Sequence, residues 1–118
     1  MLDRVRADAD LKGVVVYDAM LAPSASPAEA GKVKARVLVL NGGGDPFVKP
    51  EAVVAFNSEM TAAKVDYRYV SYPDVKHAYS NPQATELGQQ FSLPFAYGAE
   101  ASTLANAEAM KFFGEVFK

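Results

Sequence analysis

The sequence contains no cysteine and only a single histidine, His77. Without cysteine, the chain cannot form a disulfide bond, a thiolate metal site or a cysteine nucleophile. A transition-metal site is not expected either, because no acidic cluster at ligand spacing accompanies the one histidine. We therefore expect a protein that binds no metal and no cofactor.

Long apolar runs are also missing. No apolar stretch approaches the roughly 18 residues that span a membrane, and residues 1–13 are charged where a signal peptide needs an apolar run. The 12 basic and 14 acidic residues give a net charge of −2, and the basic residues are scattered along the chain. These features argue against a membrane or a nucleic acid as the main partner. We expect a soluble, cytoplasmic protein.

Size and composition bound the number of domains. Half of the 118 residues are hydrophobic, and a chain of this length buries about two thirds of the surface that it exposes when unfolded. No internal repeat, low-complexity segment or linker divides the sequence. We therefore expect a single domain over residues 1–118.

Three segments have the composition of buried β-strands. Each is of strand length and rich in aliphatic or aromatic residues; the three are Leu11–Met20, Ala35–Asn41 and Val65–Pro73. Apolar residues at helical spacing lie between the second and the third, over residues 50–64. Strands that alternate with helices imply right-handed crossovers, so we expect an α/β fold with a parallel sheet of about three strands flanked by helices.

The last part of the chain predicts a loop and a closing helix. The segment from Asp74 to Gly98 indicates a long loop, because prolines and glycines interrupt it. Residues 99–118 then predict a helix that closes the domain by packing on the sheet. The apolar stripe expected to face the sheet comprises Leu104, Met110, Phe113 and Phe117.

Two polar residues follow predicted strands at positions where chemistry is expected. Asp45 comes just past one strand, in the run VLVLNGGGDPF, and His77 comes just past the next. Because ligands bind at the carboxyl ends of parallel strands, we expect the two side chains to meet in one crevice. A carboxylate beside an imidazole fixes the tautomer of the histidine and stabilises the imidazolium, as in the acid and base half of a catalytic triad.

Both residues can also have a purely structural role. Asp45 can be a turn or N-cap residue before the helix that opens at Pro50, and His77 can be a partly buried loop histidine. Residues 42–44, three glycines, match no phosphate-binding pattern, and we expect them to let the chain turn sharply. From these residues alone, the alternatives stay open.

Several segments together resemble a known family. VLVLNGGGDPFV and YPDVKHAY, with FSLPFAYGAEA and the closing helix, are similar to the C-terminal half of dienelactone hydrolase family proteins, which are α/β-hydrolases. The resemblance runs from about Ala9 to the C-terminus. It implies a partial α/β-hydrolase fold in which Asp45 is the triad acid and His77 the triad base.

The sequence departs from the family pattern in two places. The family's nucleophile lies on a Gly-x-Ser/Cys-x-Gly turn before the first strand predicted here, and no serine of this sequence has glycine two residues before and two residues after it. The family's carboxylate-binding arginine falls on Asn81, which cannot supply a charged, bidentate fork. The resemblance therefore implies a small-molecule ester or lactone without dienelactone specificity, and a pocket lined by Asn81, Tyr79 and Phe95.

Two functions stay open. The first is a carboxylic ester or lactone hydrolase fragment that keeps the triad aspartate and histidine and lacks the nucleophile. The alternative is a non-catalytic α/β-hydrolase remnant that binds a small molecule or another subunit. Because a sheet of three strands leaves the apolar edge strand Leu11–Met20 uncovered, we expect a homodimer or a partner chain to cover it.

Overall fold

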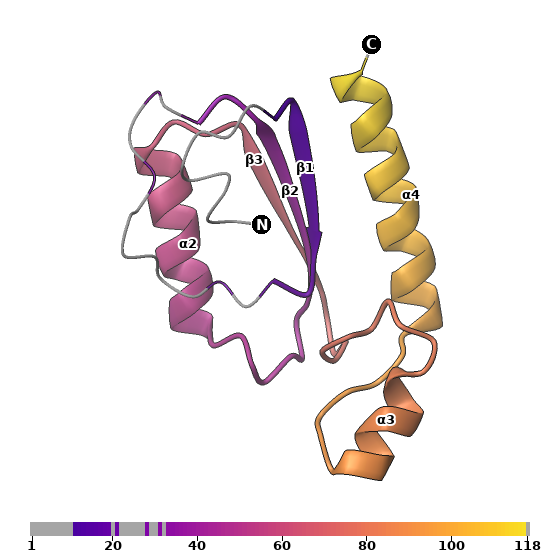
Figure 1. The fold of residues 1–118 in the computed structure, drawn as a ribbon. Helices are drawn as coiled ribbons and strands as arrows, with labels where there is room; N and C mark the ends of the chain where they lie inside the picture. Colours follow the sequence, from indigo (N-terminus) through magenta and orange to yellow (C-terminus); the bar gives the residue numbers. More distant parts are fainter. Residues whose placement is uncertain (1–10, 20, 22–27, 29–30, 32, 118) are drawn as a thin grey trace.

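The structure is a computed structural model that describes residues 11–19, 21, 28, 31 and 33–117. The elements of these residues are, in order, β1 (Gly13–Tyr17), β2 (Arg36–Gly42), α2 (Pro50–Ala62), β3 (Tyr67–Tyr72), α3 (Ala84–Phe91) and α4 (Ala99–Val116). The strands form one parallel sheet in the order β1-β2-β3 (Figure 1). The predicted α/β fold, a parallel sheet of three strands flanked by helices, is confirmed.

The central strand β2 carries the core. Six of its seven residues are buried, and successive side chains alternate between the two faces of the sheet. Val37 and Val39 pack in a cluster with Phe56 of α2, whereas Leu38 and Leu40 pack in a second cluster with α4. α2 and α4 therefore cover opposite faces of the sheet (Figure 1).

β1 is shorter and less buried than the sequence predicts. The prediction is a strand over Leu11–Met20 that is buried on both faces, but β1 has five residues, and only Val14 among them is buried. Its residues are less buried because β1 has one neighbouring strand, β2, within the described part of the chain. β1 stops before Asp18, whose φ of 53° is outside the range of extended backbone. Residue 20 of the predicted strand lies outside the described residues.

α4 packs on the sheet with small side chains. Its buried hydrophobic residues are Ala101, Ala105, Ala109 and Phe112. Alanines one turn apart let a helix come close to the strands that it covers. The four residues predicted to face the sheet are exposed instead, so that prediction is wrong. They are Leu104 (51% exposed), Met110 (72%), Phe113 (37%) and Phe117 (60%).

The segment predicted as one long loop, Asp74–Gly98, contains the helix α3, which corrects that prediction. Gly88 lies inside this helix and is buried, and a Cβ at this position would be 2.6 Å from the Phe95 carbonyl oxygen. The glycine thus permits a close approach of the returning chain and does not break the helix. The helix ends at Phe91, and the residue that caps it, Ser92, has a left-handed φ of 54°.

No helix in the described part of the chain is both long enough and apolar enough to cross a membrane.

Candidate active site

The three glycines of residues 42–44 bring two loops into contact. Gly44 donates its N–H to the carbonyl of Val75 (2.9 Å), and a Cβ at Gly42 would collide with the same carbonyl oxygen. None of the three has a positive φ. Their role is therefore a close approach of two backbones rather than the left-handed conformation expected of a sharp turn. As a result, Asp45 lies beside the loop that carries His77.

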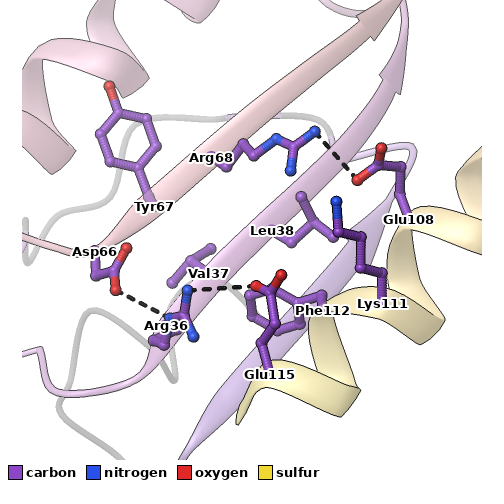
Figure 2. A pocket seen from close by; sticks show the side chains of 10 residues that line it. All are labelled: Arg36, Val37, Leu38, Asp66, Tyr67, Arg68, Glu108, Lys111, Phe112 and Glu115. Atoms are coloured by element: carbon purple, nitrogen blue, oxygen red, sulfur yellow. Dashed lines mark ion pairs between the residues drawn. The ribbon is translucent and has the colours of Figure 1, made fainter.

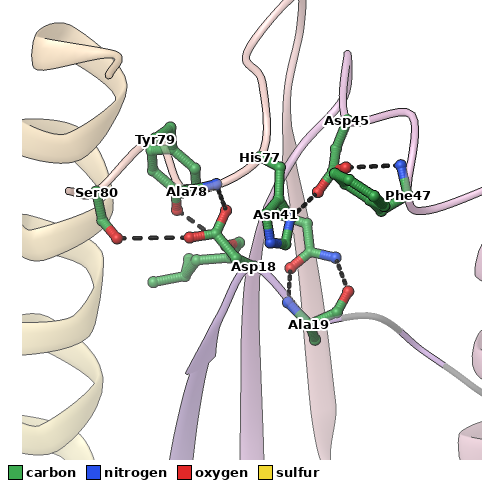
Figure 3. A network of polar contacts seen from close by, with 10 residues as sticks. Asp18, Ala19, Asn41, Asp45, Phe47, His77, Ala78, Tyr79 and Ser80 are labelled. Atoms are coloured by element: carbon green, nitrogen blue, oxygen red, sulfur yellow. Dashed lines mark hydrogen bonds and ion pairs between the residues drawn. The ribbon is translucent and has the colours of Figure 1, made fainter. Parts of the chain in front are cut away.

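Asp45 and His77 form a short hydrogen bond (Figure 3). Nδ1 of His77 lies 2.6 Å from Oδ2 of Asp45, and Oδ1 of Asp45 accepts the N–H of Phe47 at 2.8 Å. An ionised carboxylate only accepts hydrogen bonds, so this contact favours the tautomer that carries its proton on Nδ1 and leaves a lone pair on Nε2. The Asp45 side chain is fully buried, whereas the His77 side chain is 20% exposed. His77 is thus bound to a buried side chain, while part of its own side chain is accessible to solvent.

Aromatic side chains fix the orientation of the imidazole. The ring of Phe47 lies 5.0 Å from the His77 ring and meets it edge-on, and the ring of Phe95 lies 5.4 Å from it. The carbonyl of His77 also accepts the N–H of Ala96 at 3.3 Å. The ring and the backbone of His77 are therefore both held, as an oriented base requires.

A second aspartate lies near His77, and the sequence analysis missed it. Asp18 follows β1; its Oδ1 accepts the N–H of Ala78 at 3.2 Å, and its Oδ2 lies 3.5 Å from the hydroxyl of Ser80 (Figure 3). Burial raises the pKa of the Asp18 carboxyl, and the charge of Asp45 adds to the rise, whereas His77 and the two hydrogen bonds oppose it. The signal that identified Asp45, an aspartate after an apolar strand, also identifies Asp18 once β1 is known to end at residue 17.

Asn41 joins the end of β2 to the segment that follows β1. Its side chain is fully buried; Oδ1 accepts the N–H of Ala19 at 2.8 Å, and Nδ2 donates to the carbonyl of Ala19 at 2.9 Å. These two bonds satisfy the backbone of the residue next to Asp18, as a neighbouring strand would. Sequence reasoning counted Asn41 only as the end of a strand and gave it no role.

The three residues predicted to line a pocket lie in different surroundings. Phe95 contacts His77, as described above. Tyr79 is fully buried and donates its hydroxyl to the Leu40 carbonyl at 2.9 Å, and burial raises the pKa of this hydroxyl. Asn81 is exposed, and its Oδ1 accepts the N–H of Gln83 at 3.0 Å. A role of these three residues in substrate binding stays a prediction.

Asp18, Asp45 and His77 each offer an atom that could bind a metal ion, and the three atoms lie within 4.8 Å of one another. However, both oxygens of Asp45 and Nδ1 of His77 already take part in hydrogen bonds. The cluster is therefore arranged as a hydrogen-bonded acid and base. The expectation that the protein binds no metal and no cofactor stays a prediction.

A cavity of about 240 Å³ lies at the other end of the sheet, where β2 and β3 begin (Figure 2). Charged side chains on its wall pair with one another: Arg36 with Asp66 at 3.0 Å, and Arg68 with Glu108 at 3.1 Å. Exposed pairs of this kind contribute little to stability. Because these charges are paired and no predicted site residue lines the cavity, it does not indicate the reactive site.

The fold and the pair together define a class of protein. In α/β-hydrolases, the acid and the histidine of the triad follow consecutive parallel strands in this order, and Asp45 and His77 occupy such positions. A profile of the dienelactone hydrolase family matches residues 2–117, and the chain belongs to this family. The resemblance stated from the sequence is thereby confirmed. Among curated proteins, no sequence matches the chain.

Solved structures of similar proteins support the same fold. One is the dienelactone hydrolase-like promiscuous phosphotriesterase P91 from metagenomic libraries, with 26% identity and a TM-score of 0.83 over 98% of this chain and 46% of that one. Another, named m3DLH, has 29% identity and a TM-score of 0.86 over 99% of this chain and 47% of that one. The chain thus spans less than half the length of these proteins, and its fold is a partial α/β-hydrolase fold.

Proposed function

We propose that the site hydrolyses carboxylic esters or lactones, with His77 as the general base and Asp45 as the group that orients it. The observation that carries the proposal is the 2.6 Å hydrogen bond between Nδ1 of His77 and a fully buried carboxylate. This bond holds the tautomer in which Nε2 can accept a proton. Family membership adds that the pair stands on a hydrolase fold.

The reaction that these residues support is attack by water. Nε2 of His77 removes a proton from water as the water oxygen bonds to the carbonyl carbon, and Asp45 stabilises the resulting imidazolium. Collapse of the tetrahedral intermediate breaks the bond to the alcohol oxygen, which takes the proton back from Nε2. The proposed step takes water as the nucleophile, because none of these 118 residues lies in a Gly-x-Ser-x-Gly sequence.

We propose neutral, activated esters and lactones as the substrate class. Asn81, at the position where the family resemblance expects an arginine, cannot bind a substrate carboxylate through a charged fork. Asp18 and Asp45 add negative charge near His77 and therefore disfavour anionic substrates. A neutral phosphotriester is a second probe, since one similar protein of known structure is named as a promiscuous phosphotriesterase.

The test is the initial rate of hydrolysis of a short-chain aryl ester by the wild type and by His77→Ala. We expect a rate above the buffer background that His77→Ala lowers by at least about 100-fold, the usual contribution of a general base. Lys76→Ala is the matched control, because Lys76 is exposed, precedes His77 and should leave the rate unchanged. A rate that His77→Ala does not change would contradict the proposal and favour the alternative, a non-catalytic binding module.

A further inference from the structure

Asp18 is a partly buried carboxylate that takes no part in the proton transfers of the proposed reaction. One of its oxygens lies within 4.8 Å of a ligand atom of both Asp45 and His77. No lysine or arginine in the described part of the chain forms an ion pair with it. Burial removes hydration from this carboxylate, no lysine or arginine of the described residues compensates for the loss, and its hydrogen bonds offset part of it.

Those hydrogen bonds lead to the loop that begins at His77. Oδ1 of Asp18 accepts the N–H of Ala78, the residue directly after the histidine, at 3.2 Å. Oδ2 lies 3.5 Å from the hydroxyl of Ser80, at the outer limit for a hydrogen bond. The first contact is the better of the two, and it joins the end of β1 to the backbone next to the proposed base.

The backbone at both ends of this contact is in an unfavourable conformation. Ala78 has a φ of 61°, and Asp18 has a φ of 53°. A residue with a Cβ stays in the left-handed region only where its surroundings hold it there. The left-handed turn at Ala78 directs the chain away immediately after His77, and the bond to Asp18 is a contact that holds this turn.

We propose that Asp18 is a further positioning residue of the site, whose carboxylate holds residues 77–80 in the conformation that keeps Nδ1 of His77 on Asp45. Asp18 acts through the backbone and does not touch the reacting atoms. Its meaning for catalysis rests on the function proposed above. Its effect on the geometry of His77 can be measured without any activity.

The experiment uses the fact that His77 is the only histidine of the chain, so that every imidazole signal in an NMR spectrum belongs to it. Ring ¹⁵N and Nδ1–H signals would be recorded for the wild type, Asp18→Asn and Asp18→Ala. We expect the wild type to show a protonated Nδ1 with the downfield proton of a short bond to a carboxylate. Asp18→Asn keeps an oxygen acceptor for Ala78 and should keep this signal, whereas Asp18→Ala should lose or broaden it.

Controls separate positioning from general destabilisation. Asp66→Ala removes an aspartate that precedes β3 and whose side chain is 70% exposed, and this substitution should leave the His77 signals unchanged. Asp18→Ala signals identical to those of the wild type would overturn the proposal. If Asp18→Ala does not fold, hydrogen exchange of the Ala78 N–H in the wild type tests the proposal instead. Strong protection of the Ala78 N–H supports the proposal, and exchange as fast as in an open loop overturns it.

An activity measurement then distinguishes this proposal from the proposed function. If the wild type hydrolyses the ester, Asp18→Ala should lower kcat by about 10-fold with little change in KM, and Asp18→Asn should recover most of the loss. If the wild type is inactive but Asp18→Ala loses the Nδ1–H signal, the hydrolase function fails and the positioning role stands. An active Asp18→Ala variant with an unchanged kcat would overturn the positioning role while leaving the hydrolase function intact.

Discussion

The two aspartates near His77 occupy equivalent places at the ends of neighbouring strands, but their surroundings differ. Asp45 is fully buried, and both of its oxygens accept hydrogen bonds from nearby N–H groups. Asp18 has two longer contacts, and burial raises the pKa of its carboxyl. The Asp45 side chain is therefore fully provided with hydrogen-bond donors, whereas the charge of Asp18 is held at a cost in stability.

This difference predicts that Asp18→Asn stabilises the protein near neutral pH. Because the pKa of Asp18 is raised above its ordinary value of 3.8, the folded state binds more protons than the unfolded state between 3.8 and the raised pKa. Stability contributed by this group is present below pH 3.8 and is lost as pH rises through the folded pKa. Removing the charge should therefore raise Tm at neutral pH and have little effect at about pH 3.

Thermal unfolding at the two pH values measures this effect. Asp66→Asn is the control, since this exposed aspartate should show no comparable gain. A lower Tm for Asp18→Asn than for the wild type at neutral pH would contradict the prediction. Such a result would mean that the hydrogen bonds of the ionised carboxylate to the loop stabilise the fold by more than the burial of its charge destabilises it.

At the scale of elements, the close approach of two loops brings Asp45 and His77 together. β2 ends in the glycines of residues 42–44, which lie against the loop after β3, and this contact brings Asp45 to His77. The side chain of Asn41 fixes the neighbouring segment after β1. The site is thus assembled from the ends of three consecutive parallel strands, in agreement with the general place of ligand sites in open α/β sheets.

Gly42→Ala should separate these loops. Its Cβ would collide with the Val75 carbonyl, which is backbone and cannot move away easily, so we expect a loss of about 3 kcal/mol in the free energy of unfolding and a weaker Asp45–His77 contact. Gly114→Ala is the matched control. Nothing lies within 4 Å of a Cβ there, and an alanine in this exposed part of α4 should stabilise by about 1 kcal/mol. Equal effects of the two substitutions in denaturant unfolding would contradict the role given to Gly42.

Elements differ in how well the sequence predicts them. The strand β2 and the pair Asp45 and His77 were predictable, because apolar runs set the strands and parallel strands align their ends. The buried face of α4 was not. Leu104 and Phe113 are nine positions apart, which at 3.6 residues per turn places them on opposite sides of a helix. A prediction that takes the large apolar residues of this helix as the buried ones therefore misses the buried face, which consists mainly of alanines.

Contacts between residues far apart in the chain could not be predicted from the sequence either. The bond between Asp18 and the N–H of Ala78 joins residues 60 positions apart and needs a left-handed turn at an alanine, a conformation that no local pattern predicts. The glycines of residues 42–44 were recognised, but only the structure shows that the lack of a Cβ, and not a positive φ, makes them necessary.

At the scale of the whole molecule, β1 lies at one edge of the sheet formed by the described residues. Within the described residues, this strand has a partner only on the side of β2. α4 lies alongside it, since the Tyr17 hydroxyl donates to Asn106 at 2.7 Å. Met110 and Phe113, further along the same helix, are exposed. A strand that has one partner among the described residues, together with exposed apolar side chains on the helix that contacts it, favours association with a further chain.

We therefore expect a homodimer, in which two copies pair near β1 and α4. Light scattering at micromolar concentration should give the mass of two chains, and Met110→Glu with Phe113→Glu should shift it toward that of one chain, because the charges would face an apolar partner. Val54→Glu is the control, an exposed apolar position on α2, across the sheet. A wild type that stays monomeric would contradict this expectation.

The most direct test of the central claim is the rate of ester hydrolysis by Asp45→Asn beside that by the wild type. Asparagine keeps the size of the side chain but removes the charge that holds the Nδ1–H tautomer and stabilises the imidazolium. If the buried pair is a working acid and base, kcat should fall by at least about 100-fold while the protein stays folded. A folded Asp45→Asn variant that hydrolyses the ester as fast as the wild type would show that the pair has no part in the reaction.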